Sequence, residues 1–390
     1  MTASPVPNFY AEALPQLRKV ALYVTYVAGT EPKPRSTTAG TTDVPQPTLL
    51  FGPDRVEWAP APTDSATAPI TLRLPLPVDP TPIRAERLAP ATDGPSDRSS
   101  LVFHLRATGV GLTQTTPHRR TFLAEREPPL AAGRLVNAKA IRCRQCHTFV
   151  ARTQPAVPDS ANNTEPFRPL DLPSEHWSEL LDCWMCHPDE ETKYIMKLPS
   201  AAAPERPAAG DSENDTHLFF KYAIEFTNDP VSEPTILRAP STAFAVADLV
   251  ESGKAHANYR FCLYRDRQHK EPVALLWLLH WNVIVSTNAL AIGRKINGTG
   301  ALRLPDDIRS DLAKLAHTPS EALKVGYLDS TIDAVAFQKH ANQWRARGDV
   351  ESLYYPAHLC TEIMGALRAS SYALPPNLCQ FNGFQVGLLL

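Results

Sequence analysis

Apolar residues in the first 120 positions recur with a partial period of two, and proline-rich stretches interrupt them. This alternation and the many β-branched residues are typical of antiparallel sheets or sandwiches, where successive side chains point to opposite faces. We therefore expect a β-rich, sandwich-like N-terminal domain at residues 1–130. Its expected strands are 19–27, 48–59, 70–78 and 100–108, and its expected exposed loops are 31–47 and 83–100.

The last third of the chain mixes strand and helix patterns, so we expect an α+β C-terminal domain at residues 217–390. The terminal FNGFQVGLLL is strand-like and needs a partner strand. In the segment 306–317, Asp306 is a plausible N-cap and Ile308, Leu312 and Leu315 share one face. Further helices are expected at 333–347, ending before Gly348, and at 357–369, and strands at 217–226, 258–265 and 273–285.

Composition refines this picture of a β-rich α+β protein. A length of 390 residues allows two or three domains, and 43% hydrophobic with 21% charged residues is ordinary for a globular chain. The 38 prolines are about twice the usual proportion of about 5%, which favours short strands and long loops over long helices. We expect the low-complexity stretch 199–216 to be a linker or disordered loop.

Charge and hydropathy give no sign of nucleic-acid or membrane partners. The formal net charge is −2, from 39 basic and 41 acidic residues, so we expect no direct contact with nucleic acid or anionic membrane. The most apolar run, 273–285, is shorter than the about 20 residues of a membrane span. The N-terminus lacks a basic region followed by an apolar core, so we expect no secretory signal and a reducing compartment.

Two CxxCH pentapeptides hold four of the seven cysteines, with 36 residues between the pairs. Clustered cysteines in a reducing compartment more often bind metal than form disulfides. Each pair can place two thiolates on one tetrahedral ion, so two pairs complete a closed structural site without an open position for catalysis. We expect one structural Zn²⁺ in a central segment, residues 131–198, bound by Cys143, Cys146, Cys183 and Cys186.

Other interpretations of the CxxCH motifs stay open at this stage. The same pentapeptide is the attachment motif of c-type haem, although no export signal accompanies it here. A thioredoxin-like redox function requires a neighbouring βαβ pattern, which this region lacks, and unliganded core cysteines are a third interpretation. His147 and His187 could replace a cysteine as zinc ligands, but we expect both beside the site.

The sequences IRCRQC at 141–146 and LDLPSEHWSELLDCWMCHPDE at 170–190 resemble the signature of the HECT-like, E2-binding E3 ubiquitin ligase family. The resemblance continues to the FNGFQVGLLL ending. It implies a cytoplasmic or nuclear protein that binds a ubiquitin-conjugating enzyme (E2) and is a candidate ubiquitin-protein transferase. Fungal members of the family are also linked to pre-mRNA 3′-end processing.

A HECT-type ligase carries ubiquitin as a thioester on a cysteine of its C-terminal lobe, which requires an accessible, reactive thiol. Outside the four proposed zinc ligands, only Cys262, Cys360 and Cys379 remain. Cys262 lies in an expected buried strand, so Cys360 and Cys379 are the candidate catalytic residues. Neither lies in a HECT-type catalytic motif.

Two functions therefore fit the sequence. The first is an E2-binding, HECT-like E3 ubiquitin ligase or ligase cofactor that acts through protein–protein contacts. The alternative is a non-catalytic chaperone or adaptor that binds and stabilises a pre-mRNA 3′-end cleavage and polyadenylation factor, its endonuclease subunit.

Overall fold

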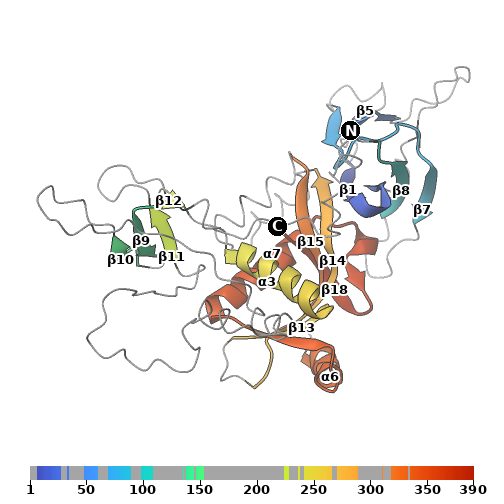
Figure 1. Cartoon of the computed structure of the whole chain (residues 1–390). Coiled ribbons are helices and arrows are strands. Elements are labelled where there is room, and N and C mark those ends of the chain that lie inside the picture. Colours follow the sequence, from blue (N-terminus) through green and yellow to red (C-terminus); the bar gives the residue numbers. More distant parts are fainter. Residues whose placement is uncertain are drawn as a thin grey trace, which may run out of the picture. The chain divides into compact units, whose positions relative to one another are not determined.

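The computed structural model describes the chain in separate stretches that belong to two compact units (Figure 1). Unit 1 comprises Met1–Arg126 and Pro240–Leu390, and unit 2 comprises Glu127–Ala239. The described residues are 7–27, 33–34, 48–59, 69–88, 98–108, 135, 138–144, 146–152, 224–227, 236–237, 241–265, 270–288, 310, 318–332 and 334–390.

The described part of unit 1 is built on a 10-stranded sheet. Its main path runs β17-β18-β15-β14-β1-β2-β8-β7, with antiparallel neighbours throughout, while β13 pairs with β14 and, in parallel, with β16. The strands are β1 Asn8–Leu14, β2 Lys19–Val27, β7 Arg84–Leu88, β8 Arg98–Arg106, β13 Arg260–Tyr264, β14 Ala274–Thr287, β15 Ser320–Asp329, β16 Val350–Tyr354, β17 Gln380–Phe381 and β18 Phe384–Leu389.

Strand β14 joins the two ends of the chain in this sheet. Near its start Trp277 is paired with Arg260 of β13, and near its end Val285 is paired with Glu12 of β1. At about 3.3 Å per residue, 14 residues extend about 46 Å, which is enough for both partners. We expected residues 1–130 and 217–390 as separate domains, whereas the structure places strands from both ranges in one sheet.

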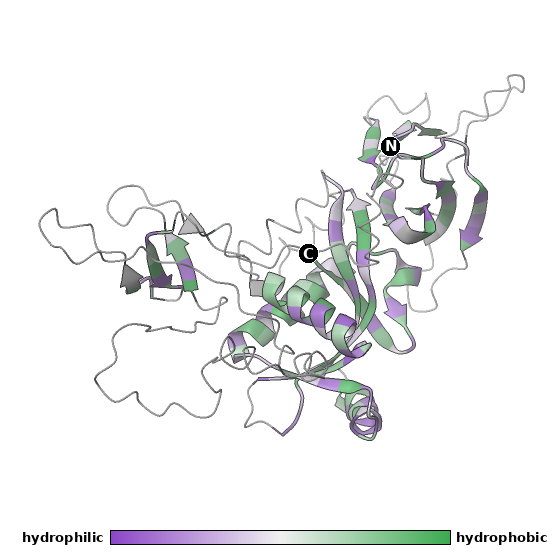
Figure 2. Cartoon of the chain, viewed as in Figure 1, coloured by the Kyte–Doolittle hydropathy of each residue, from purple (hydrophilic) through white to green (hydrophobic). Residues whose placement is uncertain are grey.

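A second, 4-stranded sheet packs on the N-terminal strands and gives this region its sandwich character. It contains β3 Lys33–Pro34, β4 Thr48–Phe51, β5 Arg55–Ala59 and β6 Ile70–Arg73. Alternate residues of β1 and β2, including Phe9 and Leu22, form one core with Trp58 and Leu72 of the second sheet. Figure 2 shows hydrophobic and hydrophilic residues together on these strands.

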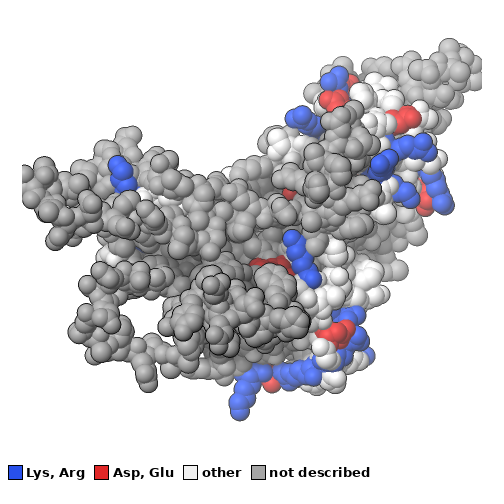
Figure 3. Space-filling view, in the orientation of Figure 1, with Lys and Arg blue, Asp and Glu red and all other residues white. Residues whose placement is uncertain are grey.

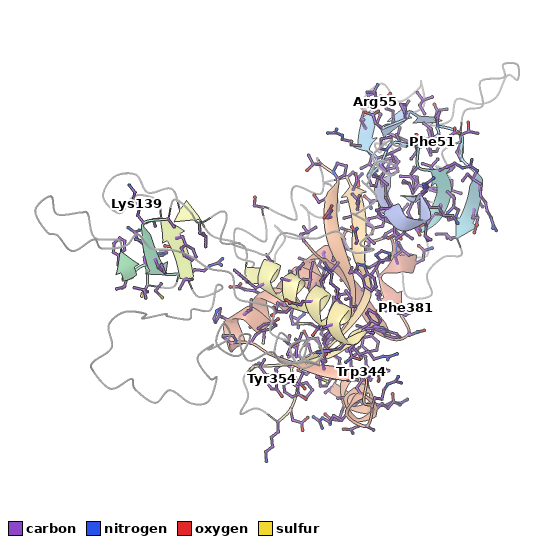
Figure 4. The ribbon with its side chains drawn as sticks, in the orientation of Figure 1. Phe51, Arg55, Lys139, Trp344, Tyr354 and Phe381 are labelled. Carbon is purple, nitrogen blue, oxygen red and sulfur yellow. The ribbon has the colours of Figure 1, made fainter. Side chains whose placement is uncertain are left out.

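Three α-helices of the described residues complete unit 1: α3 Ser241–His256, α6 Ala334–Arg345 and α7 Ala357–Ser371. Helix α7 packs against β18, where the Ser370 hydroxyl donates to the Leu388 carbonyl at 2.9 Å. The approach is so close that a Cβ at Gly387 would lie 2.5 Å from the Leu367 carbonyl oxygen. Helix α6 packs through Trp344, which Figure 4 labels; its ring stacks on that of Phe384 with the centroids 5.3 Å apart.

The structure confirms a β-rich α+β chain and corrects several local expectations. The segment 83–100, expected as a loop, contains β7 and the start of β8. Helix α6 ends at Arg345, so Gly348 does not follow it directly and has no left-handed φ. Strands β1 and β15 and helix α3 were not expected. The expected helix 306–317 lies almost wholly, and the linker 199–216 wholly, outside the described residues.

The described part of unit 2 is a 4-stranded sheet in the order β10-β9-β11-β12, with antiparallel neighbours. Its strands are β9 Ala140–Cys143, β10 Phe149–Arg152, β11 Ile224–Thr227 and β12 Ile236–Leu237. In the part of the chain that the structure describes, no helix has both the length and the apolar character needed to cross a membrane.

Candidate functional site

The first CxxC pair spans the end of β9 and the turn that leads to β10, in the part of the chain where Figure 4 labels Lys139. The Cys143 N–H donates to the Thr148 carbonyl at 2.9 Å, and the His147 N–H donates to the Cys143 carbonyl at 2.8 Å. His147 closes the turn with a left-handed φ of 57°. The turn brings the Cys143 and Cys146 side chains into hydrogen-bond contact, with Cys146 exposed and Cys143 half-buried.

This turn favours the thiolate form of Cys146. Hydrogen bonds from Thr148, first its side chain and then its backbone, and a further one from Cys143 lower the pKa of the Cys146 thiol to about 7. The thiolate is the form that binds metal and acts as a nucleophile. The first CxxC pair can therefore supply two ligands to a soft divalent ion.

A buried carboxylate lies beside the turn. Glu225 of β11 is paired in register with Arg142 of β9, and its Oε1 lies 2.9 Å from Nδ1 of His147. The Glu225 side chain is 0% exposed and that of His147 is 61% exposed. Among the described residues, Oε2 of Glu225 and Oγ1 of Thr227 are buried without a hydrogen-bond partner.

The other two predicted zinc ligands, Cys183 and Cys186, lie outside the described residues. Within the described residues, no three side chains of the metal-binding types converge on one point. The turn therefore shows two neighbouring thiols, and a four-cysteine site stays a prediction. The expectation that His147 lies beside the site likewise stays a prediction; its Nδ1 lies 2.9 Å from Oε1 of Glu225.

The candidate catalytic residue Cys360 is buried in α7. Its side chain is 3% exposed, and its thiol donates to the Tyr264 carbonyl at 3.5 Å and to the Tyr355 carbonyl at 3.6 Å. Burial raises the pKa of Cys360 to about 11, an effect that Arg265 partly offsets. At pH 7 such a group is a thiolate in about one molecule in 10⁴.

Cys262 of β13 has a similar environment. It is 3% exposed, and burial raises the pKa of its thiol to about 11, although Arg345 acts in the opposite direction. The sequence interpretation of Cys262 as a core residue agrees with this position. Its burial makes it a suitable reference for Cys360.

The second candidate, Cys379, follows the short helix η5, Pro376–Leu378, and is half-buried. Its thiol lies 3.2 Å from the Pro375 carbonyl oxygen and 3.5 Å from that of Leu374. Carbonyl oxygens accept an S–H proton, whereas a thiolate would face their lone pairs. The Cys379 thiol therefore lies among carbonyl oxygens that can accept its S–H proton.

Glu225 is the residue near the first CxxC pair that sequence analysis missed. The sequence does contain a sign of this residue, because the stretch Ile224–Thr227, which is buried, carries a carboxylate between two apolar residues. A buried strand rarely carries an unpaired acid. The partner, His147, is 78 positions away in sequence, so only the fold could identify it.

The visible surface in Figure 3 carries Lys and Arg next to Asp and Glu over the described residues. Exposed ion pairs such as Arg347 with Asp349, 2.7 Å apart, illustrate this mixing.

Comparison with known proteins identifies the family. A family model described as HECT-like ubiquitin-conjugating enzyme (E2)-binding matches residues 12–215 and 209–386. The chain is 24% identical to a mouse protein named as an E3 ubiquitin-protein ligase over 281 residues, which cover 64% of this chain and 73% of the mouse protein.

The other mammalian relatives give a consistent result. The orang-utan (Pongo abelii) protein of the same name is 23% identical over 64% of this chain and 74% of its own length, and the bovine protein is 26% identical over 57% and 67%. No solved structure matches the chain. Since the family model spans nearly the whole sequence, the chain belongs to the HECT-like, E2-binding protein family.

Proposed function

We propose that this protein binds a ubiquitin-conjugating enzyme and promotes ubiquitin transfer through protein–protein contacts, in the cytoplasm or nucleus. The E2-binding family and the relatives named as E3 ligases support this proposal. We infer the mode of action from the environment of the C-terminal thiols. Cys262 and Cys360 are each 3% exposed, and Cys379 faces carbonyl oxygens.

These environments favour direct transfer over a thioester on this chain. In a HECT-type step, the ligase sulfur attacks the E2–ubiquitin thioester carbonyl and the E2 thiolate leaves. A buried thiol such as that of Cys360 or Cys262 is a poor nucleophile for that reaction. In direct transfer, a substrate lysine amine attacks the same carbonyl, the E2 thiolate again leaves, and this chain contributes binding and orientation.

A single-turnover assay tests the mode of action. E2 enzymes charged with ubiquitin are mixed with the full chain and free lysine, and thioester loss is followed on non-reducing gels. We expect faster discharge of at least one E2 and no reducible ubiquitin adduct on this chain. Cys360→Ala and Cys379→Ala should retain the acceleration, as should the equally buried reference Cys262→Ala. A reducible adduct that either candidate variant abolishes would establish HECT-type catalysis instead.

The adaptor function predicts a different result in the same experiment. A chaperone for the 3′-end-processing endonuclease should bind that subunit stably and accelerate no E2. Failure of every E2 to bind or discharge, together with a stable complex with the endonuclease, would replace the ligase proposal.

We also propose that Cys143, Cys146, Cys183 and Cys186 bind one structural Zn²⁺. The paired thiols of the β9–β10 turn support this site. A closed four-thiolate site contributes to folding and leaves no position for a catalytic water. Elemental analysis should find one zinc per chain, and Cys183→Ser should lower both the zinc content and the soluble yield. Metal-free wild-type protein, or haem absorbance, would contradict the proposal.

A further inference from the structure

Glu225 has no role in the proposed function, yet its burial requires an explanation. Its carboxylate is 0% exposed, and an ionised carboxylate is costly to bury unless it is paired. Its one hydrogen-bond partner among the described residues is His147, at 2.9 Å. The pair therefore connects a buried strand to the exposed turn that carries the two thiols.

The backbone of this turn is held in a conformation that favours glycine. His147 has a φ of 57°, which is uncommon for residues with a Cβ, although histidine tolerates it better than branched residues do. Such conformations persist where surrounding contacts enforce them and cluster at functional sites. Here the enforcing contacts are the His147 N–H bond to the Cys143 carbonyl and the side-chain bond to Glu225.

We propose that the β9–β10 turn is a preorganised metal-binding turn with Cys143 and Cys146 as ligands, and that Glu225, acting through His147, positions it. This inference rests on the zinc site proposed above. Hydrogen bonds from residues outside the ligand set orient the ligands of a metal site, and loss of such a partner typically lowers metal affinity about 10- to 100-fold.

The geometry assigns His147 a positioning role. When Nδ1–H donates to Glu225, the ring is held toward β11, and no three metal-binding side chains converge among the described residues. His147 directly follows Cys146, so fixing the imidazole also fixes the backbone that carries the second thiol. The strands on either side of the turn are held together as well, because the Arg142 guanidinium of β9 packs over the Phe149 ring of β10 at 4.1 Å.

The test measures zinc affinity in the full chain by competition with a chromophoric chelator. It also records the thiolate-to-metal absorption of Co²⁺-substituted protein. We expect Cys143→Ser to abolish tight binding. Glu225→Gln, which keeps the shape but removes the charge, should raise the zinc dissociation constant about 10-fold or more and leave saturating stoichiometry at one.

Two substitutions at His147 separate the side-chain role from the backbone role. His147→Gly relieves the left-handed backbone but loses the bond to Glu225, and His147→Asn tolerates the same φ. Both should weaken zinc binding about as much as Glu225→Gln. Wild-type affinity in His147→Gly would show that only the backbone conformation matters and would overturn the role of Glu225.

Matched controls distinguish the two levels of the proposal. Cys262→Ala and Glu12→Gln alter a buried thiol and a buried carboxylate of unit 1 and should bind zinc as the wild type does. No zinc in the wild-type protein would overturn the metal site as a whole. If the Cys143→Ser variant still binds zinc, the turn does not supply the ligands. Zinc held equally by wild type and Glu225→Gln would overturn the positioning role alone.

Discussion

Replacing Lys324 with methionine should destabilise unit 1, because it leaves a buried carboxylate without its ionic partner. Lys324 of β15 donates to Oε2 of Glu12 on β1 at 2.8 Å, and the side chains are 15% and 11% exposed. The Tyr10 hydroxyl donates to the same oxygen at 3.0 Å. This contact links the N-terminal and C-terminal parts of the sheet across β14.

The 2.8 Å distance between the Lys324 and Glu12 charges sets the expected loss of unfolding free energy. At an effective dielectric constant of about 20, two unit charges 2.8 Å apart attract by about 6 kcal/mol, and the desolvation of both ions offsets most of this. Removing one partner of a buried pair costs about 3–5 kcal/mol. Because Tyr10 still donates to Glu12, we expect the lower end for Lys324→Met, about 3 kcal/mol.

Urea denaturation monitored by tryptophan fluorescence measures this loss. The matched control is Arg347→Met, because Arg347 binds Asp349 at 2.7 and 2.8 Å on the surface, where solvent screening leaves ion pairs with little effect on stability. The double variant Glu12→Gln/Lys324→Met should recover part of the loss, since the amide oxygen still accepts from Tyr10. If Lys324→Met costs no more than Arg347→Met, the buried pair does not stabilise the sheet.

Three further predictions test other parts of unit 1. Gly387→Ala should cost about 1–3 kcal/mol of unfolding free energy in the same assay, because the new Cβ meets the backbone of Leu367, whereas Gly348→Ala, with nothing within 4 Å, should be nearly neutral. In native protein at pH 8, iodoacetamide should modify Cys360 and Cys262 at least about 100-fold more slowly than in urea, because their pKa values are raised to about 11. Mass spectrometry gives the modification rates, and equal rates in native protein and in urea would contradict the buried environments. Burial alone would raise the pKa of Glu351, but hydrogen bonds from Ser252, His256 and Asn258 lower it. The stabilisation that Glu351 provides is therefore present above the unfolded carboxyl pKa of about 4.3 and is lost as pH falls through the lower folded value. Glu351→Gln should flatten the dependence of stability on pH below about 4.5, and an unchanged acid profile would count against this role.

Local patterns predicted those elements whose side chains alternate clearly. The alternation at 19–27 and 100–108 corresponds to β2 and β8, and the helical spacing at 357–369 corresponds to α7. The expected strand at the end of the chain corresponds to β18, whereas its hairpin with β17 was not predicted; there Asn382 and Gly383 adopt φ values of 49° and 82°, as an Asn-Gly turn does. Strand β7 was not readable, because its sequence RAERL is mostly polar and forms an edge.

The sequence located the first part of the candidate site but not its support. The CxxC spacing placed Cys143 and Cys146 together in one turn, as the structure does. The contact between His147 and Glu225 could not be predicted, because it depends on β11 pairing with β9 across 78 positions of sequence. The environments of Cys360 and Cys379 likewise depend on carbonyl groups that the fold brings to them.

The sequence by itself determined the β-rich α+β class, the paired cysteines and the family resemblance, because periodicity and motif spacing are local properties of the chain. Tertiary structure alone decided that both ends share one sheet through β14, that Glu12 forms an ion pair with Lys324 and that Glu225 forms a hydrogen bond with His147. These contacts join residues separated by tens to hundreds of positions. Their partners are selected by strand register and by the need to pair buried charge, which only the folded chain defines.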